Sequence, residues 1–255
     1  VDGVTKQQYA VNLESNLRAL HHTIRCGGWR PRPSREVLIP KPQGGTRPLA
    51  VGCLEDKIVQ TLTARILEAL YEPLFHRHSY GFRRGKSAHQ ALGRLYSVIR
   101  ARREKCVVVE MDIEKFFNSV NHEWLMQKLK LKIGDEHFLR LIHRMLRGSI
   151  LHEDGSLTET ERGTPQGSPV SPMLANICLH HLLDGWFDAE YAGKGEFVRY
   201  ADDAVFVFTD EATAQSFQAA LQLRLQEAGL SLNIAKSAIV PFSCRAPQGF
   251  VSFLG

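Results

Sequence analysis

The sequence lacks a long apolar run, a recognisable signal peptide and any pair of cysteines at metal-binding spacing. No stretch approaches the roughly 18 apolar residues of a membrane-spanning helix, so we expect no membrane partner. The 5 cysteines are scattered without a C-x-x-C pair, which argues against a disulfide framework and a zinc module. A reducing cytoplasm is the natural setting for such a chain.

Internal repeats, low-complexity tracts and flexible linkers are also missing. The 255 residues, 44% of them hydrophobic, suffice for one large domain or two closely packed subdomains. Lys and Arg outnumber Asp and Glu by 32 to 27, a formal charge of +5 that favours an anionic partner without identifying nucleic acid. The positive charge is gathered in three groups: Arg25, Arg30, Arg32, Arg35, Lys41 and Arg47; Arg77, Arg83, Arg84 and Lys86; Arg100, Arg102, Arg103 and Lys105.

Helical and strand patterns are mixed in the first 105 residues. A capping box at Thr5 and Gln8, followed by a helical apolar repeat, predicts a helix that ends near Gly27. Strands are expected at 35–39 and 47–51, joined across a glycine-rich tip, and helices at 56–71 and from Ser87 toward Arg103.

From residue 106 onward the pattern is that of a sheet covered by helices. A strand at 106–111 precedes helices after Asn121 and Asp135, a hairpin near Asp154 and a long helix opened by Ser171. A helix at 209–229 and strands at 230–232 and 238–240 complete this part. The expected fold class is therefore α+β.

Two adjacent carboxylates, Asp202 and Asp203, lie between the apolar runs 197–199 and 204–208. This arrangement predicts a β-hairpin with the pair at its turn. Asp112 ends the predicted strand 106–111 and offers a third carboxylate. Because Asp is common in turns, the pair alone is more often solvated than metal-binding. Three converging carboxylates, however, suit a site for two divalent cations.

The order of the motifs is more specific than any one of them. Asp112 is followed by Gly163-Thr164-Pro165-Gln166-Gly167-Ser168-Pro169, then by Tyr200-Ala201-Asp202-Asp203, and then by Lys236. In this order, the sequence resembles reverse transcriptases of the group II intron type, which include related CRISPR-associated enzymes. The resemblance runs from Val1 to Gly255 and includes these further segments: Ile39-Pro40-Lys41-Pro42, Arg47-Pro48-Leu49, Ser79-Tyr80-Gly81-Phe82-Arg83 and Met111 to Phe117.

The resemblance implies a right-hand polymerase fold with fingers, a palm built on an antiparallel catalytic sheet, and no thumb within the sequence. We expect fingers at 1–105, including the N-terminal helix, and a palm at 106–255 with a fingers-derived helical portion around 121–160. Because the chain starts at Val1 and ends at Gly255 inside a motif, we expect it to be a piece of a longer protein.

Site residues follow from the same resemblance. It implies that two Mg²⁺ ions, for which Mn²⁺ could substitute, are held by Asp112, Asp202, Asp203 and the carbonyl of Ile113. It further implies that Lys236 assists the leaving pyrophosphate, although a surface lysine is an equal alternative. The implied nucleotide-binding residues are Lys41, Arg47, Ile113, Phe117, Gln166 and Gly167, and the implied nucleic-acid contacts are Arg83, Arg84 and Lys86.

Two of these roles have definite alternatives. Lys41 and Arg47 would contact the triphosphate, or else belong to a solvated basic hairpin. Phe117 would lie under the sugar and exclude a 2′-OH, or else fill the core beside Phe116.

The predicted function is that of a bacterial, cytoplasmic RNA-directed DNA polymerase. It would add dNTPs to the 3′-OH of a DNA or RNA primer on an RNA template, with intron RNA or CRISPR adaptation proteins as possible partners. Two alternatives stay open: a catalytically silent, maturase-like RNA-binding scaffold, which the intact carboxylates disfavour, and an RNA-dependent RNA polymerase, which a bulky Phe117 disfavours.

Overall fold

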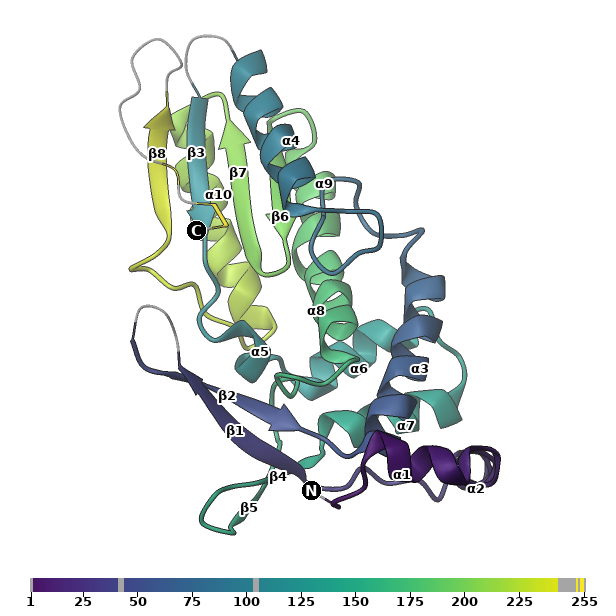
Figure 1. Cartoon of the computed structure of the whole chain (residues 1–255). Helices are drawn as coiled ribbons and strands as arrows, with labels where there is room; N and C mark the ends of the chain where they lie inside the picture. The colour runs from purple at the N-terminus through teal and green to yellow at the C-terminus, as the bar shows by residue number, and fades with distance from the viewer. Residues whose placement is uncertain (1, 41–43, 103–105, 243–250, 252, 255) are drawn as a thin grey trace. The chain divides into compact units, whose positions relative to one another are not determined.

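The computed structural model describes residues 2–40, 44–102, 106–242, 251 and 253–254, and it forms two compact units (Figure 1). The first unit comprises residues 1–69 and 121–171, and the second comprises residues 70–120 and 172–255. The unit boundaries do not coincide with the predicted boundary between residues 105 and 106. Residues 70–105 belong with the sheet of the second unit because helix α4 (Ala88–Ala101) packs on strand β6 (Gly195–Tyr200). The division into fingers and palm stays a prediction.

The N-terminal helix of the first unit is broken in two. Helix α1 spans Lys6–Val11 and opens with the predicted capping box of Thr5 and Gln8, and α2 spans Leu13–Arg25. The single predicted helix is wrong at Asn12, whose φ of −119° and ψ of 41° leave the helical region. The side-chain amide of Asn16 donates to the carbonyl of Tyr9 at 2.9 Å, so this carbonyl keeps a partner at the break.

The remaining helices of the first unit are α3 (Leu54–Tyr71), whose last two residues fall in the second unit, α6 (His122–Lys130) and α7 (Glu136–Leu146). The sheet of this unit has the order β2-β1-β4-β5. Its strands are β1 (Ser34–Pro40), β2 (Thr46–Val51), β4 (Ser149–Leu151) and β5 (Leu157–Glu159). The predicted hairpins β1–β2 and β4–β5 are confirmed, whereas the parallel pairing of β1 with β4 was not foreseen.

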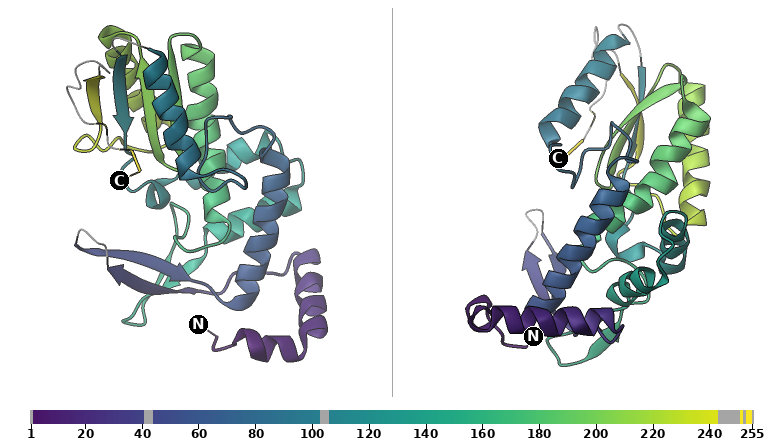
Figure 2. Two further views of the ribbon diagram at one scale, coloured as in Figure 1. Left: turned by 45° about the horizontal axis from the view of Figure 1, so that its top comes forward. Right: turned by 90° about the vertical axis from the view of Figure 1, so that its right-hand side faces the viewer.

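The second unit is built on an antiparallel sheet of order β6-β7-β3-β8. Besides β6, its strands are β3 (Cys106–Met111), β7 (Asp203–Phe208) and β8 (Ala238–Phe242). Helix α10 (Glu211–Glu227) contacts β3, β7 and β8, and α4 lies on the other side of the sheet (Figure 2, right). The continuous apolar run of β3 follows from this arrangement, because the strand is covered on both faces.

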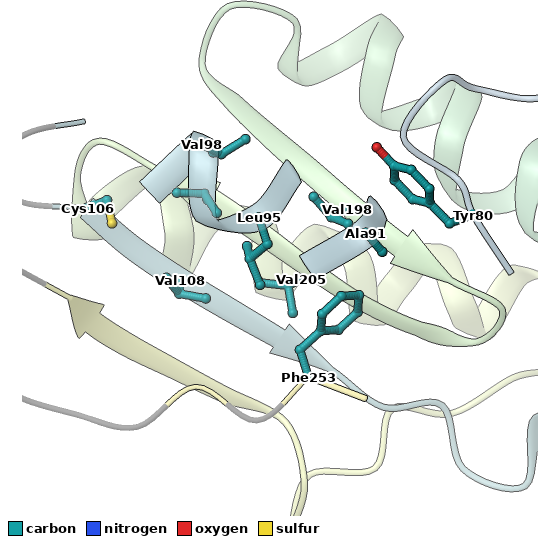
Figure 3. Packing of buried hydrophobic residues seen from close by; sticks show 10 residues of the cluster. Tyr80, Ala91, Leu95, Val98, Cys106, Val108, Val198, Val205 and Phe253 are labelled. Carbon is teal, nitrogen blue, oxygen red and sulfur yellow. The ribbon is translucent and has the colours of Figure 1, made fainter. Parts of the chain in front are cut away.

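Alternate residues of β7 point to opposite faces of the sheet and join two different groups of buried side chains. Val205 and Val207 pack with Leu95 and Val98 of α4, in the cluster that Figure 3 shows. Phe206 and Phe208 point to the other face, where their rings lie 4.5 and 5.0 Å from that of Phe217 on α10. The alternation of strand side chains therefore buries both faces of this sheet.

The long helix expected after Ser171 contains an irregular turn. Helix α8 (Ser171–Leu179) passes into a π-helical turn, η1 (His180–Asp184), before α9 (Gly185–Tyr191). The expected strand at 230–232 is wrong: only Leu232 forms a bridge, with Ile113. A short helix, α5 (Phe116–Ser119), follows Asp112. In the part of the chain that the structure describes, no helix is long and apolar enough to span a membrane.

Candidate active site

The hairpin β6–β7 closes where the sequence predicts it. Tyr200 pairs with Asp203, and Ala201 and Asp202 form the two-residue turn. Ala201 has a φ of +56°, a left-handed conformation that costs a non-glycine residue energy and therefore requires support from neighbouring residues.

Asp112 and Asp203 lie at the same end of the sheet. Met111 pairs with Ala204. Asp112, which follows Met111, and Asp203, which precedes Ala204, therefore come next in the same register. The pKa of Asp203 is raised to about 6, first by burial and then by the negative charges of Asp202, Asp112 and Glu110. The three predicted carboxylates therefore share one electrostatic environment.

Residues 233–237 surround Asp112. The Asn233 side-chain amide donates to Asp112 Oδ2 at 2.8 Å, and Lys236 Nζ lies 3.9 Å from the same oxygen. The backbone N–H of Asp112 donates to Ser237 Oγ at 3.2 Å. The structure thus brings Lys236 to a predicted catalytic carboxylate, although its side chain is 70% exposed. Sequence reasoning missed Asn233 and Ser237, whose place beside Lys236 was the available signal.

The donor chemistry of this site fits a hard divalent cation. It offers carboxylate oxygens, and positive charge there would counter both the burial and the mutual repulsion that raise the pKa of Asp203. The backbone hydrogen bonds around the bridge between Ile113 and Leu232 are made by the N–H of Glu114 and the C=O of Asp112. The Ile113 carbonyl takes no part in these hydrogen bonds.

The carboxylates of the site do not converge on a single point. Among the described residues, no group of three His, Cys, Asp or Glu side chains is arranged to hold one metal ion. Asp203 Oδ2 instead accepts the backbone N–H of Leu254 at 2.9 Å, and Asp112 Oδ2 accepts the amide of Asn233. Each of these oxygens has a further lone pair that a cation could use while the hydrogen bond is kept.

A buried ion pair supports the turn from within the unit. The side chains of Arg199 and Asp184 are both 0% exposed and are joined by two hydrogen bonds of 2.8 and 2.6 Å. Arg199 Nη1 also donates to the Ala201 carbonyl at 2.7 Å and to Asn176 Oδ1 at 3.1 Å. A charged residue at 199 within an apolar strand was the signal for this network, which sequence reasoning missed.

The segment His78–Gly81 supports the turn on its other side. Tyr80 N–H donates to the Arg199 carbonyl and Arg199 N–H donates to the His78 carbonyl, at 2.8 and 3.0 Å. A Cβ atom at Gly81 would lie 2.2 Å from the backbone nitrogen of Ala201, so only glycine fits there. The glycine of the Tyr80-Gly81-Phe82 motif therefore permits close packing against the β6–β7 turn.

Arg83 is committed to protein contacts. Its guanidinium bonds both oxygens of Glu72 and the carbonyls of His76 and Ser79, and it lies 5.4 Å from the ring centroid of Phe75. With its side chain 5% exposed, this arginine anchors its own loop in the structure, which counts against the predicted contact with nucleic acid. Arg84 is exposed, and the ammonium of Lys86 lies 5.2 Å from the ring centroid of Tyr80.

Phe117 is the more accessible residue of the Phe116-Phe117 pair. Phe116 is buried in the core, whereas Phe117 is half-buried. The Phe117 ring lies 5.5 Å from that of Phe116 and 6.4 Å from that of Phe82, which is 50% exposed. The alternative that the ring fills the core therefore describes Phe116 better than Phe117. The contact of Phe117 with a sugar stays a prediction.

The predicted nucleotide-binding residues of the first unit are placed only in part. Arg47 is exposed on β2, opposite Ile39 of β1, and Lys41 lies outside the described residues. The Gln166 carbonyl accepts the N–H of Ala50 at 2.7 Å. A Cβ atom at Gly167, whose φ is +98°, would lie 3.0 Å from the Ala50 carbonyl, so this glycine permits close packing on β2.

An antiparallel sheet with carboxylates at a hairpin turn, helices on both faces and a mixed α/β partner unit defines a right-hand polymerase. The family of reverse transcriptases (RNA-dependent DNA polymerases) matches residues 39–255. The chain belongs to this family.

Similar curated proteins come mainly from introns. An uncharacterized 91 kDa protein in a cob intron of Schizosaccharomyces pombe is 44% identical over 66% of this chain and 20% of its own length. The group II intron-encoded protein LtrA of Lactococcus lactis is 35% identical over 66% of this chain and 28% of its own length. Protein YkfC of Escherichia coli is 32% identical over 78% and 53%. The chain thus spans between a fifth and about half of these relatives.

Solved structures support the fold. A telomerase from Candida tropicalis truncated from the C-terminal domain aligns with a TM-score of 0.66, at 15% identity, over 93% of this chain and 56% of that one. A telomerase from Candida albicans, solved with a fragment of telomeric RNA, gives the same TM-score and identity over 97% and 48%. The expected polymerase fold is confirmed.

Proposed function

We propose that this chain is the fingers and palm of an RNA-directed DNA polymerase that adds dNTPs to a primer 3′-OH on an RNA template, with two Mg²⁺ ions. The observation that carries the proposal is the strand register, in which β3 pairs with β7 so that Asp112 comes to the same end of the sheet as Asp202 and Asp203 at the β6–β7 turn. Membership of the reverse transcriptase family gives this carboxylate cluster its chemical context.

Asp112, Asp202, Asp203 and the carbonyl of Ile113 would hold the ions. When bound, Mg²⁺ lowers the pKa of the primer hydroxyl and neutralises charge on the triphosphate. Asn233 orients Asp112 by donating to one of its oxygens, and Lys236 is close enough to this carboxylate to act beside the triphosphate. Asp203 is partly protonated near pH 6 in the ion-free protein, because its pKa is raised to about that value.

Other residues would select and position the substrates. Arg47 and Lys41 would contact the triphosphate, a role that suits an exposed arginine because its guanidinium binds phosphate bidentately. Phe117 would exclude the 2′-OH of an rNTP, and Gln166 and Gly167 would border the incoming nucleotide. Arg84 and Lys86 are the better candidates for contact with the nucleic acid, since Arg83 is buried.

The names of the relatives support a proposal for the RNA partner and the biological role. We propose a role in a group II intron rather than in CRISPR adaptation because the Schizosaccharomyces pombe and Lactococcus lactis relatives are both intron proteins by name. A bacterial cytoplasmic origin is compatible with the Escherichia coli and Lactococcus lactis relatives, whereas the yeast relative points to a wider distribution.

Primer extension tests the proposal. On a primed RNA template with Mg²⁺, the wild-type chain should extend with dNTPs in preference to rNTPs. Asp202→Asn should lower the extension rate at least about 100-fold by removing a metal-binding charge. Glu190→Gln removes the same charge at an exposed position of α9 and should leave the rate unchanged. If the wild-type chain bound RNA but did not extend the primer, this result would instead support the scaffold alternative. Preferential use of rNTPs would support an RNA polymerase.

A further inference from the structure

Helices α2 and α7 of the first unit border a groove of about 450 Å³. Its lining includes Arg25, Asp135, His137, Phe138, Arg140 and Arg144. These residues do not belong to the carboxylate site, which lies in the second unit. Three arginines on one groove raise the question of what neutralises them.

Two of the arginines beside this groove share their acceptors. Arg30 Nη1 donates to the carbonyls of Gly27 and Trp29 at 3.1 and 2.9 Å. Arg144 Nη1 donates to the same two carbonyls at 2.8 and 3.2 Å. Two guanidinium groups are therefore held side by side. Burial, followed by the positive charges of Arg30 and Arg140, lowers the pKa of Arg144.

No ion pair among the described residues offsets this charge. The one carboxylate that lines the groove, Asp135, accepts the N–H groups of His137 and Phe138 at 2.8 and 3.1 Å as the N-cap of α7. Within the described ranges, Arg25, Arg30, Arg140 and Arg144 form no ion pair. Arg18, on the same helix as Arg25, is by contrast paired with Glu14 at 2.7 Å.

We propose that the groove between α2 and α7 binds the phosphodiester backbone of a single nucleic-acid strand. Guanidinium groups match phosphate oxygens bidentately, and cations spread over two helices suit an extended polyanion better than a single small anion. Phe138 and the apolar side chains of Ile24 and Leu141 line the same groove, where they offer a surface for sugars and bases. The choice of nucleic acid over another polyanion rests on the proposed function.

Binding measurements with a matched charge control test the groove. The double variant Arg25→Gln/Arg140→Gln removes two groove charges, neither of which donates to a backbone carbonyl of a described residue. The control Arg18→Gln/Arg147→Gln removes two exposed charges that are paired with Glu14 and Glu159. Fluorescence anisotropy of a labelled 12-nucleotide RNA should be recorded with each 255-residue chain from 50 to 300 mM salt. Divalent cations and dNTPs are left out, so a chain that binds but cannot polymerise gives the same result.

The groove variant should lose about fivefold to tenfold in affinity at 100 mM salt, and its log K against log salt slope should become shallower by about 1 to 1.5. The control should change by less than about twofold. A DNA strand of the same sequence should lose affinity in the same ratio, because the phosphodiester chemistry is shared. Equal losses in the two variants would overturn the proposal. The proposal would also be overturned if a polyglutamate peptide or inorganic phosphate competed for binding while the groove variant bound RNA and DNA as tightly as the wild-type chain.

Discussion

The two antiparallel hairpins that carry proposed site residues differ in how firmly they are held. Strands β6 and β7 are buried along almost their whole length, whereas β1 and β2 are largely exposed. The β6–β7 turn is bonded by Arg199 and packed against Gly81. Arg47 on β2 is exposed and forms no ion pair within the described part of the chain.

This difference matches the two kinds of chemistry proposed for the hairpins. Metal ligands must hold their geometry within a fraction of an ångström, and a buried, bonded turn provides this. A cation that binds a triphosphate, by contrast, benefits from a long side chain that can follow the substrate as it moves. Substitutions around β6–β7 should therefore alter stability and activity together, whereas those on β1–β2 should alter activity alone.

Breaking the buried ion pair should have the largest effect. Arg199→Gln leaves the Asp184 carboxylate buried without its partner and should cost about 3–5 kcal/mol in the free energy of unfolding. Arg18→Gln removes an arginine from the exposed pair with Glu14 and should cost less than about 1 kcal/mol. Urea unfolding followed by circular dichroism measures both. Similar losses in the two variants would mean that the buried pair does not support the sheet.

A methyl group at the point of closest packing should have the next largest effect. Gly81→Ala places a Cβ atom against the backbone of Ala201 and should destabilise the chain by about 1–3 kcal/mol and slow extension. Gly93→Ala offers a control of opposite sign, because Gly93 lies in α4 with nothing near its Cβ position. That variant should gain roughly 0.5–1 kcal/mol. A Gly81→Ala chain as stable as the wild type would show that the turn tolerates displacement.

His78, in the segment that supports the β6–β7 turn, should make the folded chain less stable at acid pH. Burial, followed by the positive charges of Arg94, His76, Arg77 and Lys86, lowers the pKa of His78 to about 3. Between about pH 6.5 and 3 the unfolded chain binds a proton at this position and the folded chain does not, so stability falls as the pH is lowered through this window.

Replacement of this histidine tests the sign. His78→Gln should reduce the proton uptake on unfolding by up to about one proton in this window, so the acid loss of stability becomes shallower. The exposed residue His21 on α2 provides the control His21→Gln. Unfolding free energies at pH 4, 5, 6 and 7 give the slopes. An unchanged slope in His78→Gln would contradict the neutral state of this half-buried ring.

The sequence predicted the hairpins and the places of the three carboxylates at strand ends because their signals are local. Apolar runs on both sides of Asp202 define the turn, and the strand before Asp112 ends at a charged residue. The contacts that support the site depend on residues far apart in the chain. Arg199 meets Asp184, the last residue of a π-helical turn that no local pattern indicated, and Asn233 reaches Asp112 from 121 residues away. Periodicity does not encode such pairings.

The exposed hairpin should give the smallest change in stability. Arg47→Ala removes a solvated side chain and should alter the free energy of unfolding by no more than about 0.5 kcal/mol. If the guanidinium meets the triphosphate, the same variant should raise KM for dNTP and lower kcat/KM, with template affinity unchanged. Arg35→Ala, also exposed and on the neighbouring strand β1, is the matched control and should leave KM unaltered. A loss confined to template affinity would place Arg47 on the nucleic acid. A large loss of stability would show that β1–β2 is held as firmly as β6–β7, and the contrast between a buried and an exposed hairpin would then fail.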